Sequence, residues 1–161
     1  MLKILYLTVG APGSGKSTFC EKLIAKRVSR DAIRFSMIND NDKYFQKEKD
    51  VWKEYVHQIQ EEINANNTVI ADATHLNKKS RQKLLNALDL KDYVVFVLYF
   101  NVPLSICLAR NAKRIGRKKV PKDVITDMYN HMVEPALEED ERYFAILSIN
   151  DEGLIYRLKQ R

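Results

Sequence analysis

The sequence predicts an α/β fold with a mainly parallel central sheet, arranged as a three-layer sandwich of helices, sheet and helices. Three observations support this. Apolar, strand-like runs alternate along the chain with amphipathic helical segments, which is the pattern of consecutive βα units. Several of these runs are apolar throughout, as strands buried on both faces are. A glycine-rich turn directly follows the first run. We expect residues 1–161 to form a single domain.

Hydrophobic spacing places the elements of the first half of the chain. Trp52, Val56, Ile59 and Ile63 recur every three or four residues, which predicts an amphipathic helix. In the preceding helix Phe19, Leu23 and Ile24 should face inward. The expected elements are a strand over 2–9, a helix from 17 to about 27, a short helix capped by Asp31, a surface loop over 39–46, a helix over 49–66 and a strand over 68–72.

The second half is organised around YVVFVLYF at residues 93–100, the most apolar run in the chain and the best candidate for a central strand. The other expected elements are a helix over 78–88, a helix from Pro103 towards Arg110, a helix from Pro121 to about Leu137, and strands over 144–149 and 154–158. Parallel strands present their ligands at the carboxyl-terminal edge of the sheet. The loops after Val9, Asp72 and Phe100 should therefore share one edge.

Residues 10–18 read GAPGSGKST and satisfy the phosphate-loop spacing G-x-x-x-x-G-K-[ST] between a strand and a helix. In such a P-loop the backbone N–H groups cradle phosphate oxygens, the lysine reaches the β- and γ-phosphates, and the next hydroxyl ligates Mg²⁺. The sequence thus predicts a P-loop NTPase fold that binds ATP, or another nucleoside triphosphate, with Mg²⁺. The expected nucleotide contacts are Gly10, Ala11, Pro12, Gly13, Ser14, Gly15, Lys16, Ser17 and Thr18, with Ser17 also a metal ligand.

Asp31 and Arg34 lie three residues apart in SRDAIR, so they should face the same side of one helical turn. A carboxylate near the γ-phosphate can accept the proton of an attacking hydroxyl, and a guanidinium beside it can hold an acceptor phosphate. We therefore predict Asp31 as a catalytic base and Arg34 as a substrate contact. The alternative is a helix cap with a surface ion pair.

Asp72 ends the strand TVIAD after three apolar residues, in the manner of a Walker-B acid that holds Mg²⁺. The alternative is an acidic residue that only ends the strand. Thr74 follows in the loop at the same edge and is expected to contact substrate. His75 is at most a lining residue, because nothing in its surroundings marks it as a base.

Arg110, Arg114 and Arg117 are spaced by four and three residues, and Gly116 permits a hinge among them. On a helix or a mobile lid over about residues 110–121 they would project together, and a positioned arginine stabilises the charge of a migrating phosphoryl group. Arg114 is the predicted catalytic arginine and Arg110 a nucleotide contact. A solvated basic face is the alternative.

The chain carries a net charge of +6 and has a pI near 9.2, which favours a polyanionic partner. Cys20 and Cys107 show no metal-like spacing and are expected to be reduced thiols of a cytoplasmic protein. The apolar start of the chain is too short for a membrane span. We therefore expect no membrane association.

The motifs GAPGSGKST, SRDAIR, IADATHLN and RNAKR, the last followed by VP and a helix with Met128-Tyr129, together resemble the phage-type polynucleotide 5′-hydroxyl kinase domain. The resemblance covers roughly residues 3–132. It implies that Asp31 is the general base, that Arg34 contacts the acceptor phosphate, and that Lys16 and Ser17 contact donor and metal. It also implies that Arg114, with Arg110 beside it, acts on the transferred phosphate, and that DNA or RNA 5′-hydroxyl ends are the acceptors.

The chain departs from this family at three positions: Ala32 replaces a frequent second acid, Ala73 stands where an acidic loop residue sometimes lies, and His75 replaces a frequent asparagine. These departures bear on the acceptor rather than on catalysis. Two other functions stay open. A small-molecule kinase acting on a sugar, nucleoside or antibiotic hydroxyl would use the same Asp31, and an ATP-gated binding module would transfer no phosphate. The residues leave the oligomeric state open.

Overall fold

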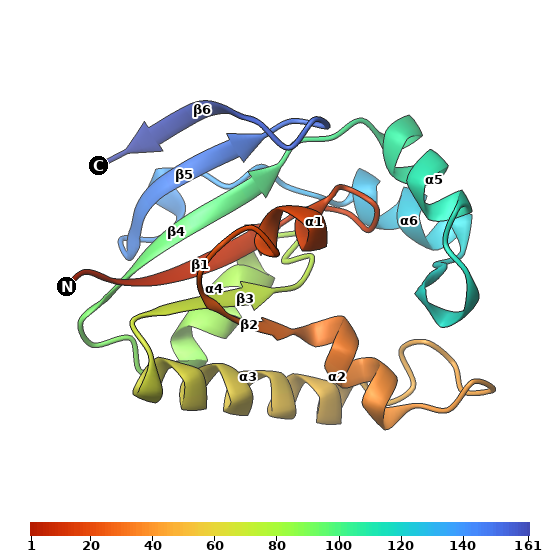
Figure 1. Cartoon of the computed structure of the whole chain (residues 1–161), viewed down its shortest axis with the longest axis horizontal. Helices are drawn as coiled ribbons and strands as arrows, with labels where there is room; N and C mark the ends of the chain where they lie inside the picture. The colour runs from red at the N-terminus through yellow and green to blue at the C-terminus, as the bar shows by residue number, and fades with distance from the viewer.

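The computed structural model describes all 161 residues and has one six-stranded sheet in the order β2-β3-β1-β4-β5-β6 (Figure 1). The strands are β1 (Lys3–Val9), β2 (Lys26–Ser29), β3 (Thr68–Asp72), β4 (Tyr93–Phe100), β5 (Tyr143–Ile149) and β6 (Ile155–Gln160). The first five pair in parallel, and only β6 runs antiparallel to its neighbour β5. The α/β fold with a mainly parallel sheet and a central β4 is confirmed.

Six α-helices and two 3₁₀ turns surround this sheet: α1 (Lys16–Cys20), α2 (Arg30–Met37), α3 (Glu48–Ala65), α4 (Lys78–Ala87), α5 (Leu104–Ala112), η1 (Gly116–Lys118), α6 (Lys122–Asn130) and η2 (Leu137–Glu139). In Figure 1, α1 lies in front of the sheet, α4 lies behind it, and α5 and α6 lie beyond the carboxyl ends of the strands. The loops that follow the parallel strands, and the helices that begin after them, therefore lie at the carboxyl-terminal edge of the sheet.

The main core lies on the face of the sheet covered by α3 and α4. Alternate residues of the central strands meet the apolar stripes of those helices there; this cluster includes Leu5, Leu7, Val9, Val95, Val97, Tyr55, Ile59, Leu84 and Leu85. On the opposite face Phe19 of α1 packs edge-to-face on Phe100, with ring centroids 5.6 Å apart. Burying each such large side chain contributes about 1.5–3 kcal/mol. Packing on the two faces of the sheet fixes the positions of β1 and α1, and therefore also the position of the glycine-rich turn that connects them.

The segment after the P-loop differs from the sequence prediction of one helix over 17–27. The helix α1 ends at Cys20, and Lys26–Ser29 instead forms β2, which the sequence analysis missed. The prediction failed because β2 pairs in parallel with the edge of β3, a long-range contact that outweighs local helix propensity. The inward placement of Ile24 was also wrong, since its side chain is fully exposed.

Two further helices differ in detail from their predictions. The helix predicted from Pro121 to Leu137 ends at Asn130. The segment after it instead contacts the loop that follows β3, where the Val133 N–H donates a hydrogen bond to the Leu76 carbonyl at 2.8 Å. In α3 the buried stripe is Val51, Tyr55, Ile59 and Ile63, so the predicted members Trp52 and Val56 lie beside it.

The helices α4 and α5 and the last two strands lie within about two residues of their predicted bounds. Cys20 and Cys107 are free, buried thiols, as expected. None of the helices combines the length and the apolar character that crossing a membrane requires.

Candidate active site

The P-loop connects β1 to α1 and has the backbone shape that its glycines permit. Gly13 and Gly15 adopt φ angles of 83° and 93°, where other residues are strained. A Cβ on Gly13 would also lie 2.5 Å from the carbonyl oxygen of Cys107. Lys16 Nζ folds back and donates to the carbonyls of Gly10 and Ala11 at 2.9 and 3.0 Å. Burial lowers the pKa of Lys16, while the nearby carboxylates of Asp72 and Asp31 act to raise it.

One buried polar atom of the P-loop has no partner: the hydroxyl oxygen of Ser14. A buried hydroxyl without a hydrogen bond costs free energy unless a ligand completes it. The unpartnered Ser14 and the lysine beside it fit an anionic ligand held inside the loop, as a nucleotide phosphate would be.

The loop after β3 is fastened to the P-loop strand by hydrogen bonds through backbone groups. Gly10 N–H donates to the carbonyl of Thr74 at 3.0 Å. The hydroxyl of Thr8 donates to the carbonyl of Ala73 at 2.6 Å and accepts from the Ala73 N–H at 3.1 Å. The predicted meeting of the loops after Val9 and Asp72 at one edge is therefore confirmed, and Thr74 lies against the P-loop.

His75 is buried under this junction and lines none of the cavities beside the P-loop, which lies within its prediction as at most a lining residue. Its backbone has φ 42°, its Nδ1 lies 2.6 Å from the carbonyl oxygen of Thr8, and its ring stacks on Tyr55. Burial lowers the pKa of His75 to about 3. The imidazole is therefore neutral, and Nδ1 donates its proton to the Thr8 carbonyl.

The two predicted metal ligands, Ser17 and Asp72, are brought together by a residue that sequence reasoning missed. Arg27 on β2 donates Nε to Asp72 Oδ2 at 2.8 Å, and its Nη2 contacts the same carboxylate oxygen at 2.7 Å and Ser17 Oγ at 2.8 Å. One nitrogen thus touches both oxygens. Two hard oxygen ligands this close fit Mg²⁺, which keeps its remaining positions for phosphates and water. No cluster of three or more His, Cys, Asp or Glu side chains forms an all-protein metal cage.

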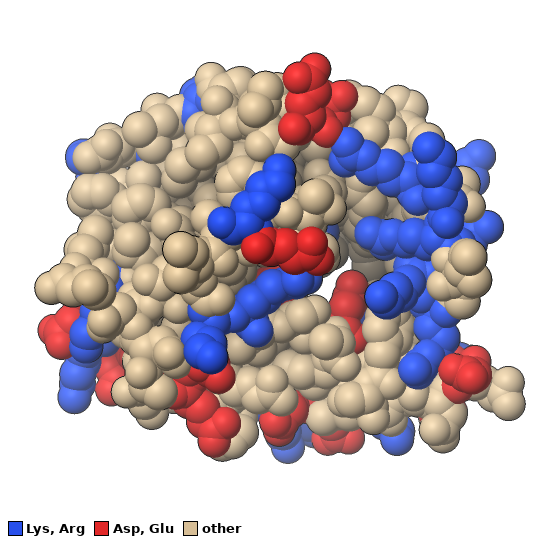
Figure 2. Space-filling model, viewed as in Figure 1, with Lys and Arg blue, Asp and Glu red and all other residues tan.

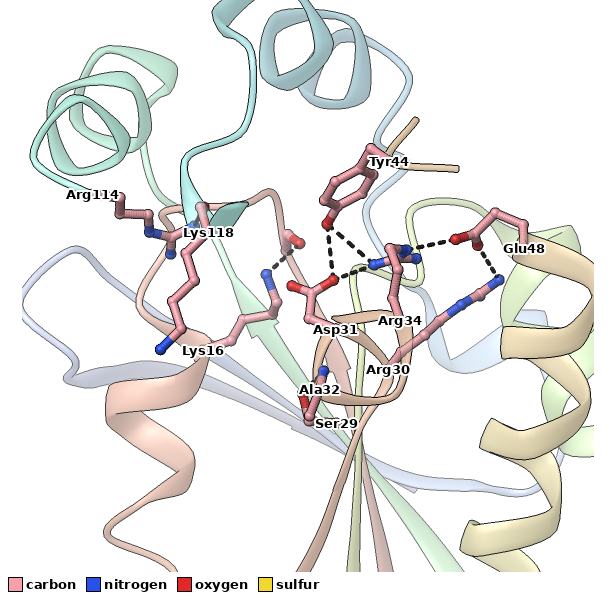
Figure 3. Close-up of polar contacts among 11 residues, drawn as sticks. Lys16, Ser29, Arg30, Asp31, Ala32, Arg34, Tyr44, Glu48, Arg114 and Lys118 are labelled. Atoms are coloured by element: carbon pink, nitrogen blue, oxygen red, sulfur yellow. Dashed lines mark hydrogen bonds and ion pairs between the residues drawn. The ribbon is translucent and has the colours of Figure 1, made fainter. Parts of the chain in front are cut away.

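Asp31 lies in the first turn of α2 and is not its cap. Ser29 caps that helix by accepting a hydrogen bond from the Ala32 N–H at 3.2 Å, so the expected capping role of Asp31 is wrong. One carboxylate oxygen, Asp31 Oδ1, accepts from the Tyr44 hydroxyl at 2.9 Å and from Arg34 Nη1 (Figure 3). The second oxygen, Oδ2, receives no hydrogen bond from the protein. Asp31 and Lys16 line the same cavity.

Arg34 is almost completely buried and is held from the far side by Glu48 at the start of α3. The carboxylate of Glu48 accepts from Arg34 Nε through one oxygen and from Arg30 Nη2, at 3.0 Å, through the other. Burial acts to lower the pKa of Arg34, but the hydrogen bond to Glu48 and the acidic groups of Tyr44, Asp31 and Glu48 together outweigh it, and the pKa is raised. Sequence analysis missed Glu48 and the hydrogen bond of Tyr44, because nothing local links them to SRDAIR.

The three lid arginines do not project together as predicted. Arg110 donates to the carbonyls of Gly13, at 3.3 Å, and Asp151, which places it against the P-loop and the β5–β6 turn. Arg114 faces the cleft between the P-loop and α2, where Lys16 and Asp31 also lie (Figure 3). Arg117 turns away and binds the α2–α3 loop, with Nε 3.1 Å from Asp40 Oδ1 and Nη1 donating to the Ile38 carbonyl at 2.7 Å.

Three cavities meet around the P-loop. One of about 340 Å³ lies between the P-loop, Arg110 and the β5–β6 turn at Asn150–Gly153. A second, of about 240 Å³, lies on the other side of Lys16 and is lined by Asp31, Arg34 and Tyr44. A third, of about 850 Å³, opens beside Arg27 and is lined by Asp31 and Lys118. Arg114 lines all three, and so stands where two ligands on either side of the P-loop would meet.

Figure 2 shows Lys and Arg side chains gathered on the side of the cleft formed by the end of α5, η1 and the start of α6. The exposed cations of this segment are Lys113, Arg114, Arg117, Lys118, Lys119 and Lys122. No acidic residue lies between them in the sequence, which makes this the most strongly basic segment of the chain.

A family model described as an AAA domain, AAA_33, matches residues 5–135. The chain belongs to this family. That match covers β1 to α6, including the P-loop, Asp31 and Arg114. The family assignment agrees with the α/β sheet and the nucleotide-binding P-loop described above.

Individual proteins are also similar to this chain. The L-seryl-tRNA(Sec) kinase of Methanococcus maripaludis is 27% identical over 141 residues, which are 82% of this chain and 53% of that protein. A structure of the Pnkp1/Rnl/Hen1 RNA repair complex matches with a TM-score of 0.66 at 27% identity, over 81% of this chain and 44% of the matched one. The chain thus spans about half the length of these two relatives.

A third match shows the fold alone. The structure of an unliganded sugar kinase from Janibacter sp. HTCC2649 has a TM-score of 0.63 at 13% identity, over 94% of this chain and 87% of the matched one. A similar fold therefore occurs both in a chain of an RNA repair complex and in a protein described as a sugar kinase. The fold by itself does not select the acceptor.

Proposed function

We propose that this protein is a kinase that transfers the γ-phosphate of ATP to the 5′-hydroxyl of a polynucleotide. The observation that carries the proposal is the position of Asp31, which lines one cavity together with Lys16, Ser17, Asp72 and Arg114 and keeps one carboxylate oxygen free of protein hydrogen bonds. A free carboxylate oxygen at the opening of a P-loop is where an incoming hydroxyl would need a base.

The donor triphosphate is assigned to the P-loop side. Backbone N–H groups and Lys16 would bind its phosphates, and the unpartnered hydroxyl of Ser14 would gain a partner there. The nucleoside would lie in the cavity between Arg110 and the β5–β6 turn, which is bordered by the P-loop. This placement directs the γ-phosphate towards the second cavity, where Asp31 lies.

Ser17 and Asp72 are the residues that would hold Mg²⁺, and the bound ion would supply charge neutralisation to the triphosphate. The guanidinium of Arg27 binds the same two oxygens. Arg27 balances the buried charge of Asp72, and a bound Mg²⁺ would compete with this guanidinium for the same two oxygens.

On the acceptor side, Asp31 Oδ2 would take the proton of the acceptor hydroxyl as its oxygen forms a bond to the γ-phosphorus. The bond from that phosphorus to the bridging oxygen of ADP breaks, and ADP leaves. Arg114, which lines both cavities, would stabilise the charge that spreads over the transferred group. Residues 110–121 would act as the lid that excludes water from this step.

A polynucleotide acceptor is supported by two observations. The exposed cations between Lys113 and Lys122 border the cleft and would attract a phosphate backbone. Both relatives at 27% identity carry RNA in their names, one as a seryl-tRNA kinase and one as part of an RNA repair complex. These names favour RNA over DNA as the acceptor.

A small-molecule kinase is the second candidate, and the buried state of Arg34 favours it. Its Nε and Nη1 are already used by Glu48, Asp31 and Tyr44, which leaves few donors for an acceptor phosphate. The cavity beside Asp31, about 240 Å³, is also small. A sugar or nucleoside would fit such a space with Asp31 in the same role.

The acceptor decides between the two candidates. The protein would be incubated with Mg²⁺ and γ-labelled ATP beside 5′-hydroxyl RNA, 5′-hydroxyl DNA of the same sequence, 5′-phosphorylated RNA, and a panel of nucleosides and sugars. We expect label on the 5′-hydroxyl oligonucleotides and none on the 5′-phosphorylated control. Labelling of only the small molecules would establish the second candidate, and nucleotide binding without transfer to any hydroxyl would establish a binding module.

A further inference from the structure

We propose that Tyr44 is a positioning residue for Asp31: its hydroxyl fixes one carboxylate oxygen and leaves the other aimed at the P-loop. The proposal rests on the function inferred above and adds a residue from the α2–α3 loop to the reaction. Tyr44 lies 13 positions after Asp31, in a polar segment with no regular secondary structure. No local motif connects the two residues.

The geometry of the hydrogen bonds assigns different tasks to the two oxygens of Asp31. Tyr44 donates its hydroxyl proton to Oδ1 at 2.9 Å, and Arg34 Nη1 donates both to Oδ1 and, at 3.1 Å, to the Tyr44 oxygen. These three groups form a closed triangle on one side of the carboxylate. Figure 3 shows the other oxygen directed away from that triangle, towards the side on which Lys16 lies. The carboxylate cannot rotate without breaking both bonds to Oδ1.

The position of the Tyr44 hydroxyl is itself fixed by packing of the ring. The ring meets Phe45 and Phe35 edge-on, with centroids 4.6 and 6.0 Å apart, and the guanidinium of Arg34 lies 4.6 Å from its centroid. Each such aromatic or cation–π contact is attractive, and together they restrain the ring. Burial raises the pKa of Tyr44 well above its ordinary value, so the phenol stays protonated and remains a donor.

Glu48 completes the arrangement from α3. It binds Arg34 Nε and so sets the angle at which the guanidinium presents Nη1 to Asp31 and Tyr44. The cluster therefore joins α2, the α2–α3 loop and α3. Such a cluster could serve only to fasten the loop to the helices, and the two roles predict different results when the Tyr44 hydroxyl alone is removed.

The charged groups around Asp31 determine the direction of the pH effect. Arg34 and Tyr44 contact the carboxylate from α2 and the loop, and Lys16 and Arg114 face it from the P-loop and the lid segment. A hydrogen bond to a carboxylate favours its charged form. Removing the Tyr44 hydroxyl should therefore weaken the stabilisation of the charged carboxylate, and the acid limb of kcat/KM should move to higher pH.

The test is Tyr44→Phe, measured on the 5′-hydroxyl acceptor that the wild-type protein phosphorylates. We expect kcat to fall about tenfold, as for loss of one hydrogen bond to a charged group, with the KM for ATP and the melting temperature unchanged and the acid limb moved upward. Tyr156→Phe is the matched control. It removes a hydroxyl that accepts from Asn101 Nδ2 at 2.8 Å, on β6 and outside the three cavities.

A second readout does not depend on turnover. The ¹³C NMR resonance of the Asp31 carboxyl carbon should move in Tyr44→Phe relative to the wild type, and it should stay in place in Tyr156→Phe. An unchanged Asp31 carboxyl resonance overturns the proposal, as does a loss of melting temperature with a wild-type pH profile, which would mark a purely structural contact. If the NMR shift is present but the wild-type protein phosphorylates no acceptor, the positioning of Asp31 holds and the proposed kinase function fails.

Discussion

The donor side and the acceptor side of the cleft are built by different means. On the donor side, backbone groups and buried side chains join the P-loop to the β3 loop: Gly10 bonds Thr74, Thr8 bonds Ala73, and His75 lies neutral beneath them. On the acceptor side, contacts run between polar side chains of an irregular loop and of the lid segment, such as Tyr44 to Asp31 and Arg117 to Asp40.

Because of this difference, the residues that hold the donor and the residues that hold the acceptor come from different kinds of sequence pattern. The donor side depends on neighbouring residues in one motif and on a buried scaffold, so changes there should alter both stability and activity. The acceptor side depends on side chains brought together from distant positions, and changes there should alter activity or local opening with little effect on global stability.

The largest effect on stability is expected from Arg81→Met. Arg81 is fully buried in α4, pairs through two nitrogens with Glu139, and donates Nη1 to the carbonyl of His75 at 2.9 Å. Removing it leaves Glu139 buried without its partner, which should cost about 3–5 kcal/mol of unfolding free energy. Urea denaturation measures this, with Lys79→Met on the exposed side of the same helix as the control. A loss no larger than that of the control would refute the buried-scaffold description.

Arg114→Ala should give the largest effect on activity among the lid residues. Because Arg114 lines all three cavities and has no ion-pair partner, its loss should lower kcat about 100-fold, near 2.7 kcal/mol, without changing the melting temperature. Steady-state kinetics on the identified acceptor provide the test. Lys113→Ala, an exposed neighbour outside the cavities, is the control for kcat, because a contact with the acceptor backbone would change KM instead. A full-rate Arg114→Ala enzyme would remove Arg114 from the mechanism.

His75 predicts a pH dependence that belongs to the donor side. Its folded pKa is about 3, below the ordinary 6.5, so only the unfolded state takes up a proton between those values. Its contribution to stability is therefore complete above pH 6.5 and declines as pH falls, by about 1.4 kcal/mol per pH unit. Urea denaturation at several pH values gives the slope of unfolding free energy against pH for the wild type and for His75→Asn. The difference between the two slopes is due to His75, because the other titrating groups are the same in both proteins. Equal slopes would contradict the buried, neutral imidazole.

Arg117→Ala should lower global stability by less than about 1 kcal/mol, because its partner Asp40 is largely exposed. Amide hydrogen exchange in residues 113–121 should nevertheless become faster, because the segment loses its bonds to the α2–α3 loop. Lys119→Ala, an exposed residue of the same segment, should leave exchange unchanged. Unaltered exchange in Arg117→Ala would mean that these contacts do not hold the lid segment down.

The same contrast explains how much could be predicted from the sequence. The P-loop, β1, β3 and β4 were predictable because fixed spacing and continuous apolar runs specify them locally. The strand β2 was not, because its structure comes from pairing with β3. Arg27 on β2 was missed for the same reason.

On the acceptor side, the pairing of Asp31 with Arg34 was predictable from their spacing of three. The contributions of Tyr44 and Glu48 were not, because they reach Asp31 and Arg34 only through the folded α2–α3 loop. The joint projection of the lid arginines failed because helix α5 ends before Arg114, so regular helical spacing no longer applies.

The most direct test of the central claim is to measure phosphoryl transfer and nucleotide affinity in Asp31→Asn. The asparagine can keep an oxygen for Tyr44 and Arg34 to bond, but it cannot take up the proton of an acceptor hydroxyl. We expect the transfer rate to fall at least about 100-fold, while the nucleotide dissociation constant stays unchanged because the contacts of the P-loop are intact. Transfer at the wild-type rate would contradict the assignment of Asp31 as the base.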